Sequence, residues 1–263
     1  MEKPQQRYAD YSSISKNESF LLGIIKNAEL TVFGVKELHV LTDWSDNRIN
    51  NTLTSLEKKE LLVRIKRNHY ALADIISEHS FELATETIKP SYISFWSALS
   101  YYGFTEQQVT QIQLVSTKQF KDHKIASYII SITTFKPELF YGYTQVEDFV
   151  IAEMEKALVD SLYLPEKCGG LNEFVKCLVN SWKTINKSKL IKYILKFDNK
   201  SLISRVGYLI DTLGLENNNL TDQLFPYRSK SYIKLWTRGE KILSYNNKWR
   251  IINNHEIELE EMI

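Results

Sequence analysis

A group of amide, hydroxyl and basic side chains with helical spacing gives the first indication of chemistry. Within residues 45–58, the apolar residues Ile49, Leu53 and Leu56 recur at i, i+4 and i+7, which predicts a helix with one buried face. The polar residues that face outward are Asn47, Arg48, Asn51, Thr54 and Lys58. Asparagine can pair with adenine and arginine with guanine in the major groove, and both can contact phosphates. The pattern predicts a DNA-recognition helix.

A β-hairpin with a basic tip is predicted directly after this helix. Leu62, Val63 and Ile65 form the first strand, and residues 70–72 form the return strand. The side chains near the tip that we expect to contact DNA are Arg64, Lys66, Arg67 and Asn68. Residues 45–72 contain six Lys and Arg against three acids, so the local charge suits a phosphate backbone. The predicted partner is double-stranded DNA, namely inverted repeats near the protein's own promoter.

The elements that would position these side chains form a winged helix-turn-helix over residues 1–80. A capping box, Ser15 with Glu18, predicts the start of the first helix. Val35 and Leu38 mark the core face of the second helix, and residues 73–89 are predicted to be a helical or irregular linker. The alternative is the same fold used only as a protein interface, because a fold alone does not fix a function.

A second domain is expected over residues 81–263, and its first part, residues 81–170, has a mixed α/β pattern. A short strand after Pro90 leads into a helix that ends at Gly103, and strand-like runs follow at 112–117, 125–134, 139–143 and 149–152. An amphipathic helix then begins near Glu153, in which Glu155, Lys156 and Asp160 are expected to lie partly outward. Lys156 and Asp160 are four residues apart and are expected to pair only weakly.

The second part of this domain, residues 171–253, has a helical pattern followed by a small C-terminal hairpin. Helices are predicted at 171–182, 187–197 and 201–213, and the dipeptides Arg238-Gly239 and Asn246-Asn247 indicate turns. Residues 254–263 form an acidic tail that we expect to be solvated. The predicted fold class of the whole chain is α+β.

Composition is that of an ordinary globular protein. The chain has 263 residues, 43% of them hydrophobic and 25% charged, with a net charge of +1. No apolar run approaches the length of a membrane span, and residues 1–13 lack the apolar core of a signal peptide. Cys168 and Cys177 suit a reducing compartment, so a cytoplasmic location without membrane contact is expected.

The positive charge is concentrated in one segment. Residues 171–250 carry 15 Lys and Arg against 6 acids, which indicates an anionic partner, either nucleic acid or an acidic protein surface. Lys187, Lys189 and Lys192 are the candidates for this surface. A merely solvated, lysine-rich face explains the same count equally well.

The chain shows little sign of catalytic chemistry. Glu153, Glu155 and Lys156 are similar in type to a nuclease triad, but Met154 stands where a second carboxylate of an E-x-K element is needed. There is no phosphate-binding loop, no nucleophile elbow and no metal-ligand spacing among the cysteines and five histidines. The expectation is a protein without catalytic residues, metal or cofactor. An unrecognised enzymatic activity of the second domain, on nucleic acid or protein, is the alternative.

Five segments together resemble the AbiEi-type antitoxins of type IV toxin–antitoxin and abortive-infection systems. They are LEKKELLVRIKRNHYAL, SYISFWSALSYYGFTEQ, IAEMEKALVDSLYLP, SRVGYLIDTLG and YIKLWTRGEKILSYNNKWRIIN, in the family's order, between about residues 20 and 253. Family members often have Gly where Glu60 and Asn68 stand, and a Pro or small residue in place of Met154. Asn68 still has access to a positive φ, whereas Glu60 makes the helix-to-hairpin geometry less certain.

The resemblance implies a function in antiviral defence. It implies a cytoplasmic antitoxin that represses its own operon through the winged helix-turn-helix. The same protein would counteract a nucleotidyltransferase-like toxin, functionally and without a requirement for direct binding. The family offers no catalytic residues to carry over to this sequence.

Overall fold

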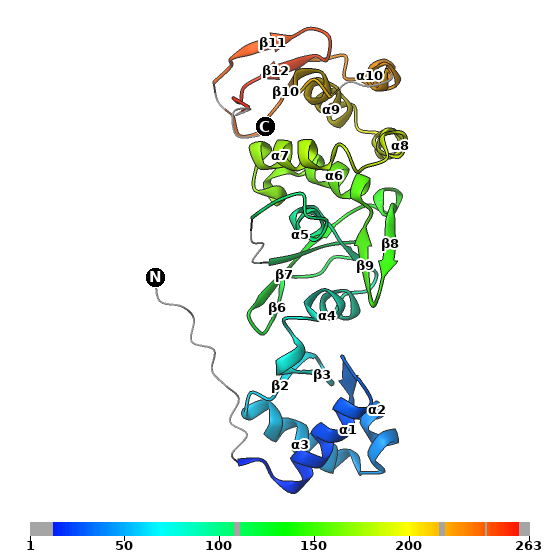
Figure 1. Ribbon diagram of the computed structural model, residues 1–263, viewed down its shortest axis with the longest axis vertical. Helices are drawn as coiled ribbons and strands as arrows, with labels where there is room; N and C mark the ends of the chain where they lie inside the picture. Colours follow the sequence, from blue (N-terminus) through cyan, green and yellow to red (C-terminus); the bar gives the residue numbers. More distant parts are fainter. Residues whose placement is uncertain (1–12, 108–110, 216–218, 240, 258–263) are drawn as a thin grey trace. The chain divides into compact units, whose positions relative to one another are not determined.

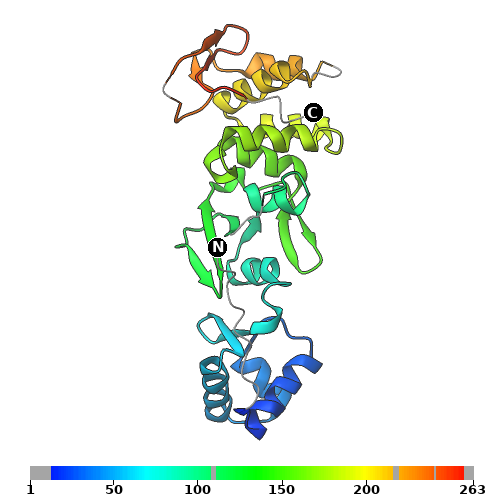
Figure 2. The same cartoon turned by 60° about the vertical axis from the view of Figure 1, so that its left-hand side comes forward.

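The chain divides into two compact units. The computed structural model describes residues 13–107, 111–215, 219–239 and 241–257. The first unit comprises residues 1–89 and 122–130, and the second comprises 90–121 and 131–263. The division therefore lies at Lys89, nine residues later than the expected boundary at residue 80, and the first unit includes a later hairpin. The expected α+β character is confirmed (Figures 1 and 2).

Helices and short strands alternate in the first unit. Its elements are α1 (Lys16–Asn27), β1 (Phe33–Gly34), α2 (Val35–Thr42), α3 (Asp46–Lys58), β2 (Leu62–Lys66), β3 (His69–Leu72), η2 (Ala73–Ile75), α4 (Ser80–Thr87) and β6 (His123–Ile125). Strands β1, β3 and β2 form an antiparallel sheet in that order. The segment expected to be a linker thus contains a helix, α4, whose Leu83 and Ala84 are buried.

Local sequence signals explain where these helices begin. The Ser15 hydroxyl accepts from the Glu18 amide while the Glu18 carboxylate accepts from the Ser15 amide, which is the predicted capping box. Ser45 caps α3 in the same way by accepting from the Arg48 amide. Side chains of α1, α2, α3 and the sheet, among them Leu21 and Leu38, then close one hydrophobic core.

A six-stranded sheet and a layer of helices make up most of the second unit, although the edge strand β6 of the sheet belongs to the first unit. The elements after α4, apart from β6, are β4 (Ser91–Ile93), α5 (Phe95–Tyr101), β5 (Gln111–Ser116), β7 (Tyr128–Thr134), η3 (Pro137–Leu139), β8 (Tyr143–Val146), β9 (Phe149–Ala152), α6 (Met154–Tyr163), η4 (Pro165–Cys168), α7 (Leu171–Ser181), α8 (Lys187–Phe197) and α9 (Lys200–Thr212). The strand order is β6-β7-β5-β4-β9-β8. The pair β4–β9 is parallel, whereas β4–β5 and β8–β9 are antiparallel.

Most predicted elements of this unit are present, but two predicted strands differ. The strand expected at 125–134 is interrupted after Ile125 by a turn in which Ala126 has a φ of +51°, and strand β7 begins at Tyr128. The three helices α7, α8 and α9 match the predicted ranges to within one residue. The helix α5 ends as expected, because Gly103 has a φ of +73° and the Phe104 amide returns to the Leu99 carbonyl at 2.9 Å. The strand expected at 139–143 is wrong. Pro137 opens the 3₁₀ helix η3 there, and strand β8 begins only at Tyr143.

The C-terminal part differs from a simple hairpin. It consists of α10 (Leu220–Leu224), η5 (Phe225–Tyr227), β10 (Ile233–Lys234), β11 (Ser244–Asn246) and β12 (Ile251–Asn253). Strands β11 and β12 form the predicted hairpin, but β10 adds to β12 in parallel, giving the order β10-β12-β11. Asn254, expected in a solvated tail, is buried and bonds Trp236 and Gly239, while residues 258–263 lie outside the described ones.

Candidate functional site

The outer surface of α3 is a continuous polar stripe. Ile49, Leu53 and Leu56 are fully buried, as predicted, and they fix the orientation of the helix. Asn47, Asn51, Thr54 and Lys58, at i, i+4, i+7 and i+11, are all exposed. At about 100° per residue these four positions lie along one line of the helix, opposite the buried residues. The stripe therefore offers two amides, a hydroxyl and an ammonium group to a partner.

Arg48 does not belong to this stripe. Its guanidinium lies over the Trp44 ring, with the carbon 3.8 Å from the ring centroid, and donates to Asn17 Oδ1 at 2.7 Å. Phe20 in turn stacks on the Trp44 ring. Arg48 thus connects α3 to α1 along the side of the helix, a role that the spacing of polar residues does not reveal.

The β2–β3 hairpin presents its basic residues unequally. Arg64, Arg67 and Asn68 are exposed, and Asn68 adopts the left-handed conformation with a φ of +60°. Lys66 is half-buried, and its ammonium group approaches the Glu86 carbonyl at 3.5 Å. The expected cation cluster at the tip is therefore reduced to the two arginines.

Backbone geometry fixes the hairpin against the rest of the unit. A Cβ added to Gly34 would lie 2.6 Å from the carbonyl oxygen of Asn68, so β1 and the hairpin turn are in close contact. The imidazole of His123 lies 2.8 Å from the Ile65 carbonyl oxygen.

Glu60, between α3 and β2, takes a φ of +58° although it is not glycine. The helix-to-hairpin connection thus forms with Glu at this position.

One cation of this region is used inside the unit. Lys59 Nζ lies 2.8 Å from Glu18 Oε2 and donates to the Ser13 carbonyl at 2.7 Å. Burial acts to raise the pKa of Glu18, but hydrogen bonds from Lys59, Ser15 and Ser55 outweigh it and lower the pKa to about 2. Lys59 therefore stabilises the N-terminus of α1 and is not part of the candidate DNA-binding surface.

In the second unit, the largest departure from expectation is a buried ion pair on α6. Lys156 and Asp160, expected to lie partly outward, are both fully buried and contact each other. Glu155, for which the same was expected, is also buried, with 5% of its surface exposed. Tyr92 and Ser94 donate to the Asp160 carboxylate at 3.1 and 2.8 Å. Burial lowers the pKa of Lys156 and raises that of Asp160. The prediction was wrong because α6 packs against α5, α7 and α8, so even its polar side is covered.

Aromatic rings complete the surroundings of Lys156. Its ammonium group lies between 4.9 and 5.6 Å from the centroids of four rings, those of Tyr92, Phe135, Tyr141 and Phe197. The Tyr141 hydroxyl donates to the Tyr193 carbonyl on α8 at 2.7 Å. Lys156 therefore points into the core, and it does not join Glu153 and Glu155 in a nuclease-like triad.

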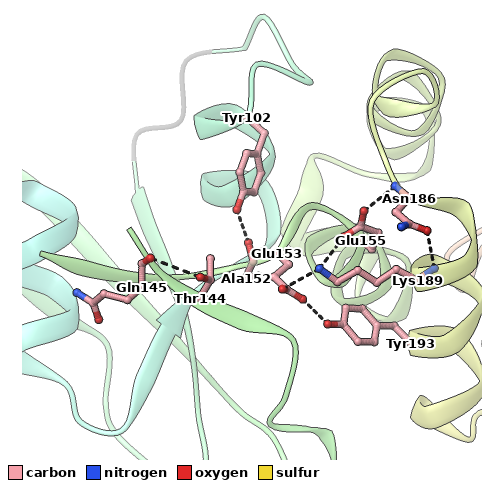
Figure 3. A network of polar contacts seen from close by, with 9 residues as sticks. All are labelled: Tyr102, Thr144, Gln145, Ala152, Glu153, Glu155, Asn186, Lys189 and Tyr193. Carbon is pink, nitrogen blue, oxygen red and sulfur yellow. Dashed lines mark hydrogen bonds and ion pairs between the residues drawn. The ribbon is translucent and has the colours of Figure 1, made fainter. Parts of the chain in front are cut away.

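Those two carboxylates instead belong to a network between α6 and α8 (Figure 3). Lys189 Nζ lies 2.7 Å from Glu153 and 3.8 Å from Glu155, and the backbone N–H of Asn186 donates to Glu155 at 2.7 Å. The Tyr193 hydroxyl donates to Glu153, and burial together with this bond raises the pKa of Tyr193. The network holds α8 against α6.

The three lysines proposed as an anionic-partner surface are thus not equivalent. Lys189 takes part in the network with Glu153 and Glu155, and the Lys187 ammonium group lies 5.6 Å from the Trp182 ring centroid. Lys192 is exposed. These positions give no single open patch on α8.

A search for known relatives identifies the fold. No protein-family model and no curated protein matches the chain. The chain is similar to the RV2827C protein from Mycobacterium tuberculosis. That crystal structure superposes with a TM-score of 0.69 at 15% sequence identity, over 91% of this chain and 92% of the RV2827C chain. At this identity the similarity to RV2827C shows a common fold and nothing about function.

The described residues contain no group of three or more His, Cys, Asp or Glu side chains that could hold a metal ion. Among the same residues, no helix is both long and apolar enough to span a membrane. Cys168 and Cys177 are buried free thiols, and their mutual hydrogen bond and burial raise the pKa of Cys168.

Proposed function

We propose that the protein is an antitoxin of a type IV toxin–antitoxin system and that it represses its own operon. In this proposal residues 16–72 form a winged helix-turn-helix, α3 is the recognition helix and the β2–β3 hairpin is the wing. The remainder of the chain counteracts a nucleotidyltransferase-like toxin. The likeness to AbiEi-type antitoxins in five ordered segments supports the antitoxin assignment.

The observation that carries the DNA-binding part is the polar stripe of α3. An α-helix fits the major groove, and Asn47 and Asn51 carry the amide group that pairs with adenine in both its donor and acceptor positions. Thr54 and Lys58 extend the stripe by two further turns, where a hydroxyl and an ammonium group suit bases or phosphates. Arg64 and Arg67 are exposed on the hairpin, and in this proposal they contact the phosphate backbone of the DNA. Arg48 is assigned a supporting role because of its contacts with Trp44 and Asn17.

Binding of the full chain to its own upstream region tests this part. Fluorescence anisotropy with that DNA and with a scrambled duplex should show preference for the former. Asn51→Ala should weaken specific binding by about 1–3 kcal/mol and relax the preference. Asn27→Ala, which removes an exposed amide from the end of α1, is the matched control and should leave binding unchanged. Equal affinity of the wild type for both duplexes would refute specificity.

The hairpin arginines should behave differently from Asn51. Arg67→Ala should weaken binding to both duplexes alike and reduce the dependence of log K on log salt by about one unit, because a phosphate contact carries no sequence information. A selective loss of binding to the upstream DNA would instead assign Arg67 to base recognition.

Antitoxin activity is tested by co-expression with the product of a neighbouring nucleotidyltransferase-like gene. The presence of such a gene directly downstream is itself the first check. We expect the Asn51→Ala protein to relieve growth arrest as well as the wild type while failing to repress its promoter. Failure of the wild-type protein to relieve the arrest would refute the antitoxin assignment, whatever the result of the DNA-binding assay.

A further inference from the structure

The three-stranded C-terminal sheet has one face packed on a helix and one face exposed. Ile251 of β12 is fully buried, and Trp249, just before it, packs so closely on α9 that a Cβ on Gly207 would lie 2.3 Å from its ring. The Trp249 indole donates to Asp211 at 2.7 Å. These contacts fix the inner face against α9, and the upper part of Figure 1 shows the strands of the sheet beside this helix.

The register of the strands defines the outer face. Lys234 of β10 and Tyr245 of β11 both pair with Ile252 of β12, so these three side chains form one row across the sheet. The neighbouring row, Ile233, Ile251 and Asn246, contains the buried Ile251 and points inward. The outer row therefore presents an aromatic ring, an aliphatic side chain and an ammonium group.

Aromatic and basic groups meet at one end of this row. The Tyr232 and Tyr245 rings are in edge-to-face contact with centroids 5.6 Å apart, and they are 38% and 58% exposed. The Arg250 guanidinium lies 5.3 Å from the Tyr232 ring centroid, and the Tyr232 hydroxyl donates to the exposed Asn247 amide oxygen. Tyr232, Lys234, Tyr245, Asn247 and Arg250 are named the tyrosine–arginine face below.

The chain segment that carries this face is basic, although one of its lysines, Lys248, pairs with Asp211 of α9 at 2.7 Å. Residues 223–255 contain seven Lys and Arg and a single acid, Glu240. A surface that joins exposed aromatic rings with cations matches the requirements of an unpaired nucleic-acid strand, whose bases stack on rings while its phosphates contact Lys and Arg. A duplex keeps its bases stacked on one another, so it cannot use the rings in this way. An acidic protein would use the cations but has no particular need for the rings.

We propose that the tyrosine–arginine face binds single-stranded nucleic acid. Tyr245 provides the stacking surface, Tyr232 supports it by their edge-to-face contact, and Arg250 and Lys234 contact phosphates. Asn247 uses its oxygen to hold Tyr232, so its amide nitrogen can donate to a base edge. This site is separate from the α3 stripe and does not rest on the proposed function.

Anisotropy titrations of the full chain with labelled strands of about 12 nucleotides test the proposal. The probes are mixed-sequence RNA, the DNA strand of the same sequence and the corresponding duplex. Both single strands should bind more tightly than the duplex. A tighter RNA complex would identify the 2′-hydroxyl as a further contact, and equal binding of RNA and DNA would assign recognition to bases and phosphates alone. Duplex binding that depends on Tyr245 as strongly as single-strand binding does would overturn the proposal, because α3 offers a duplex a site independent of this face.

Variants of Tyr245 separate stacking from general attraction. Tyr245→Ala should weaken single-strand binding between about fivefold and about a hundredfold, whereas Tyr245→Phe, which keeps the ring, should match the wild type. Tyr101→Ala removes a tyrosine of similar exposure from α5 and should have no effect. Loss of binding in the Phe variant or in Tyr101→Ala, or full binding by Tyr245→Ala, would contradict the assignment.

Two further measurements distinguish this face from a purely electrostatic site and from the α3 stripe. Polyglutamate should not displace the RNA at matched charge concentration, and displacement would show a site that responds to charge alone. Asn51→Ala on α3 should keep single-strand binding unchanged, so that a failure of operator recognition cannot be mistaken for a failure of this site.

Discussion

At the scale of single residues, the Lys156–Asp160 pair is the most consequential feature of the second unit. Two opposite charges are held without solvent, and the surrounding hydroxyls of Tyr92 and Ser94 satisfy the carboxylate. Such a pair stabilises a fold little compared with apolar residues of similar volume, but the loss of one partner leaves an uncompensated buried charge. We therefore expect the pair to specify the packing of α6 more than to stabilise the fold.

Replacing one residue of this pair should destabilise the protein more than replacing both. Lys156→Met alone should destabilise the protein by about 3–5 kcal/mol because Asp160 would remain buried and unpaired. The double variant Lys156→Met/Asp160→Leu should recover most of that loss. Urea unfolding monitored by circular dichroism provides the measurement. Additive losses in the double variant would mean that the two charges do not act as a pair.

Glu18 gives the first unit a specific sensitivity to acid. Its pKa is lowered to about 2 from an ordinary 4.5, so the ionised form is favoured in the folded state. The associated stabilisation is fully present above pH 4.5 and is lost as the pH falls from there towards 2. Hydrogen exchange of the α1 amides should therefore accelerate over this range. Glu18→Gln should abolish that pH dependence, whereas Glu57→Gln on α3 should leave it intact.

At the scale of elements, the connection between α3 and the hairpin shows strain at a single position. Glu60 adopts a φ of +58°, a conformation that costs a residue with a Cβ roughly 1–2 kcal/mol. Glu60→Gly should remove this cost. Glycine also increases the backbone entropy of the unfolded chain, which offsets part of the effect, so the free energy of unfolding should rise by up to about 1 kcal/mol. Thermal unfolding of this variant beside the wild type measures the change. A loss of stability would show that the Glu60 side chain makes a compensating contact.

Replacing Gly34 should, in contrast, destabilise the protein. A methyl group there would meet the Asn68 backbone oxygen at 2.6 Å, and neither β1 nor the hairpin turn is a flexible side chain that can move away. Gly34→Ala should therefore lower stability by about 1–3 kcal/mol and shift the hairpin. Gly23→Ala on α1, where the added atom meets nothing within 4 Å, is the control and should be neutral or slightly stabilising. Thermal unfolding of the two variants distinguishes these outcomes.

The helices and strands also show which structural features the sequence patterns predict and which they do not. Caps and apolar periodicity located α1, α3, α8 and α9, because these signals are local. They did not reveal the burial of Lys156, since periodicity identifies the most apolar side of a helix but not how many neighbours will cover its other sides. The contact of Arg48 with Trp44 was likewise missed, because it depends on how α3 and the residue before it are packed. The parallel pairing of β10 with β12 does not involve a tight turn, so no turn dipeptide in the sequence predicts it.

At the scale of the whole molecule, the second unit contains strands β4, β5, β8 and β9, most of β7 and the helical layer. A fragment beginning at Pro90 should therefore fold, with protected amides in β4 and β5. Residues 122–130 should exchange rapidly in this fragment, because they belong to the first unit and His123 would lose the Ile65 carbonyl. Hydrogen exchange of the fragment and the full chain measures the difference. Loss of protection throughout the sheet would show that the two units fold only together.

The assignment of residues 122–130 to the first unit also concerns the order of events during synthesis. The N-terminal segment is complete in sequence at residue 89, yet its last hairpin is added only about forty residues later. At about 5–20 residues per second, a ribosome needs roughly 2–8 s to supply it. During that interval the nascent first unit lacks the contact between the His123 imidazole and the Ile65 carbonyl of β2. A newly made chain would thus present α3 before the structure supporting its neighbouring hairpin is finished.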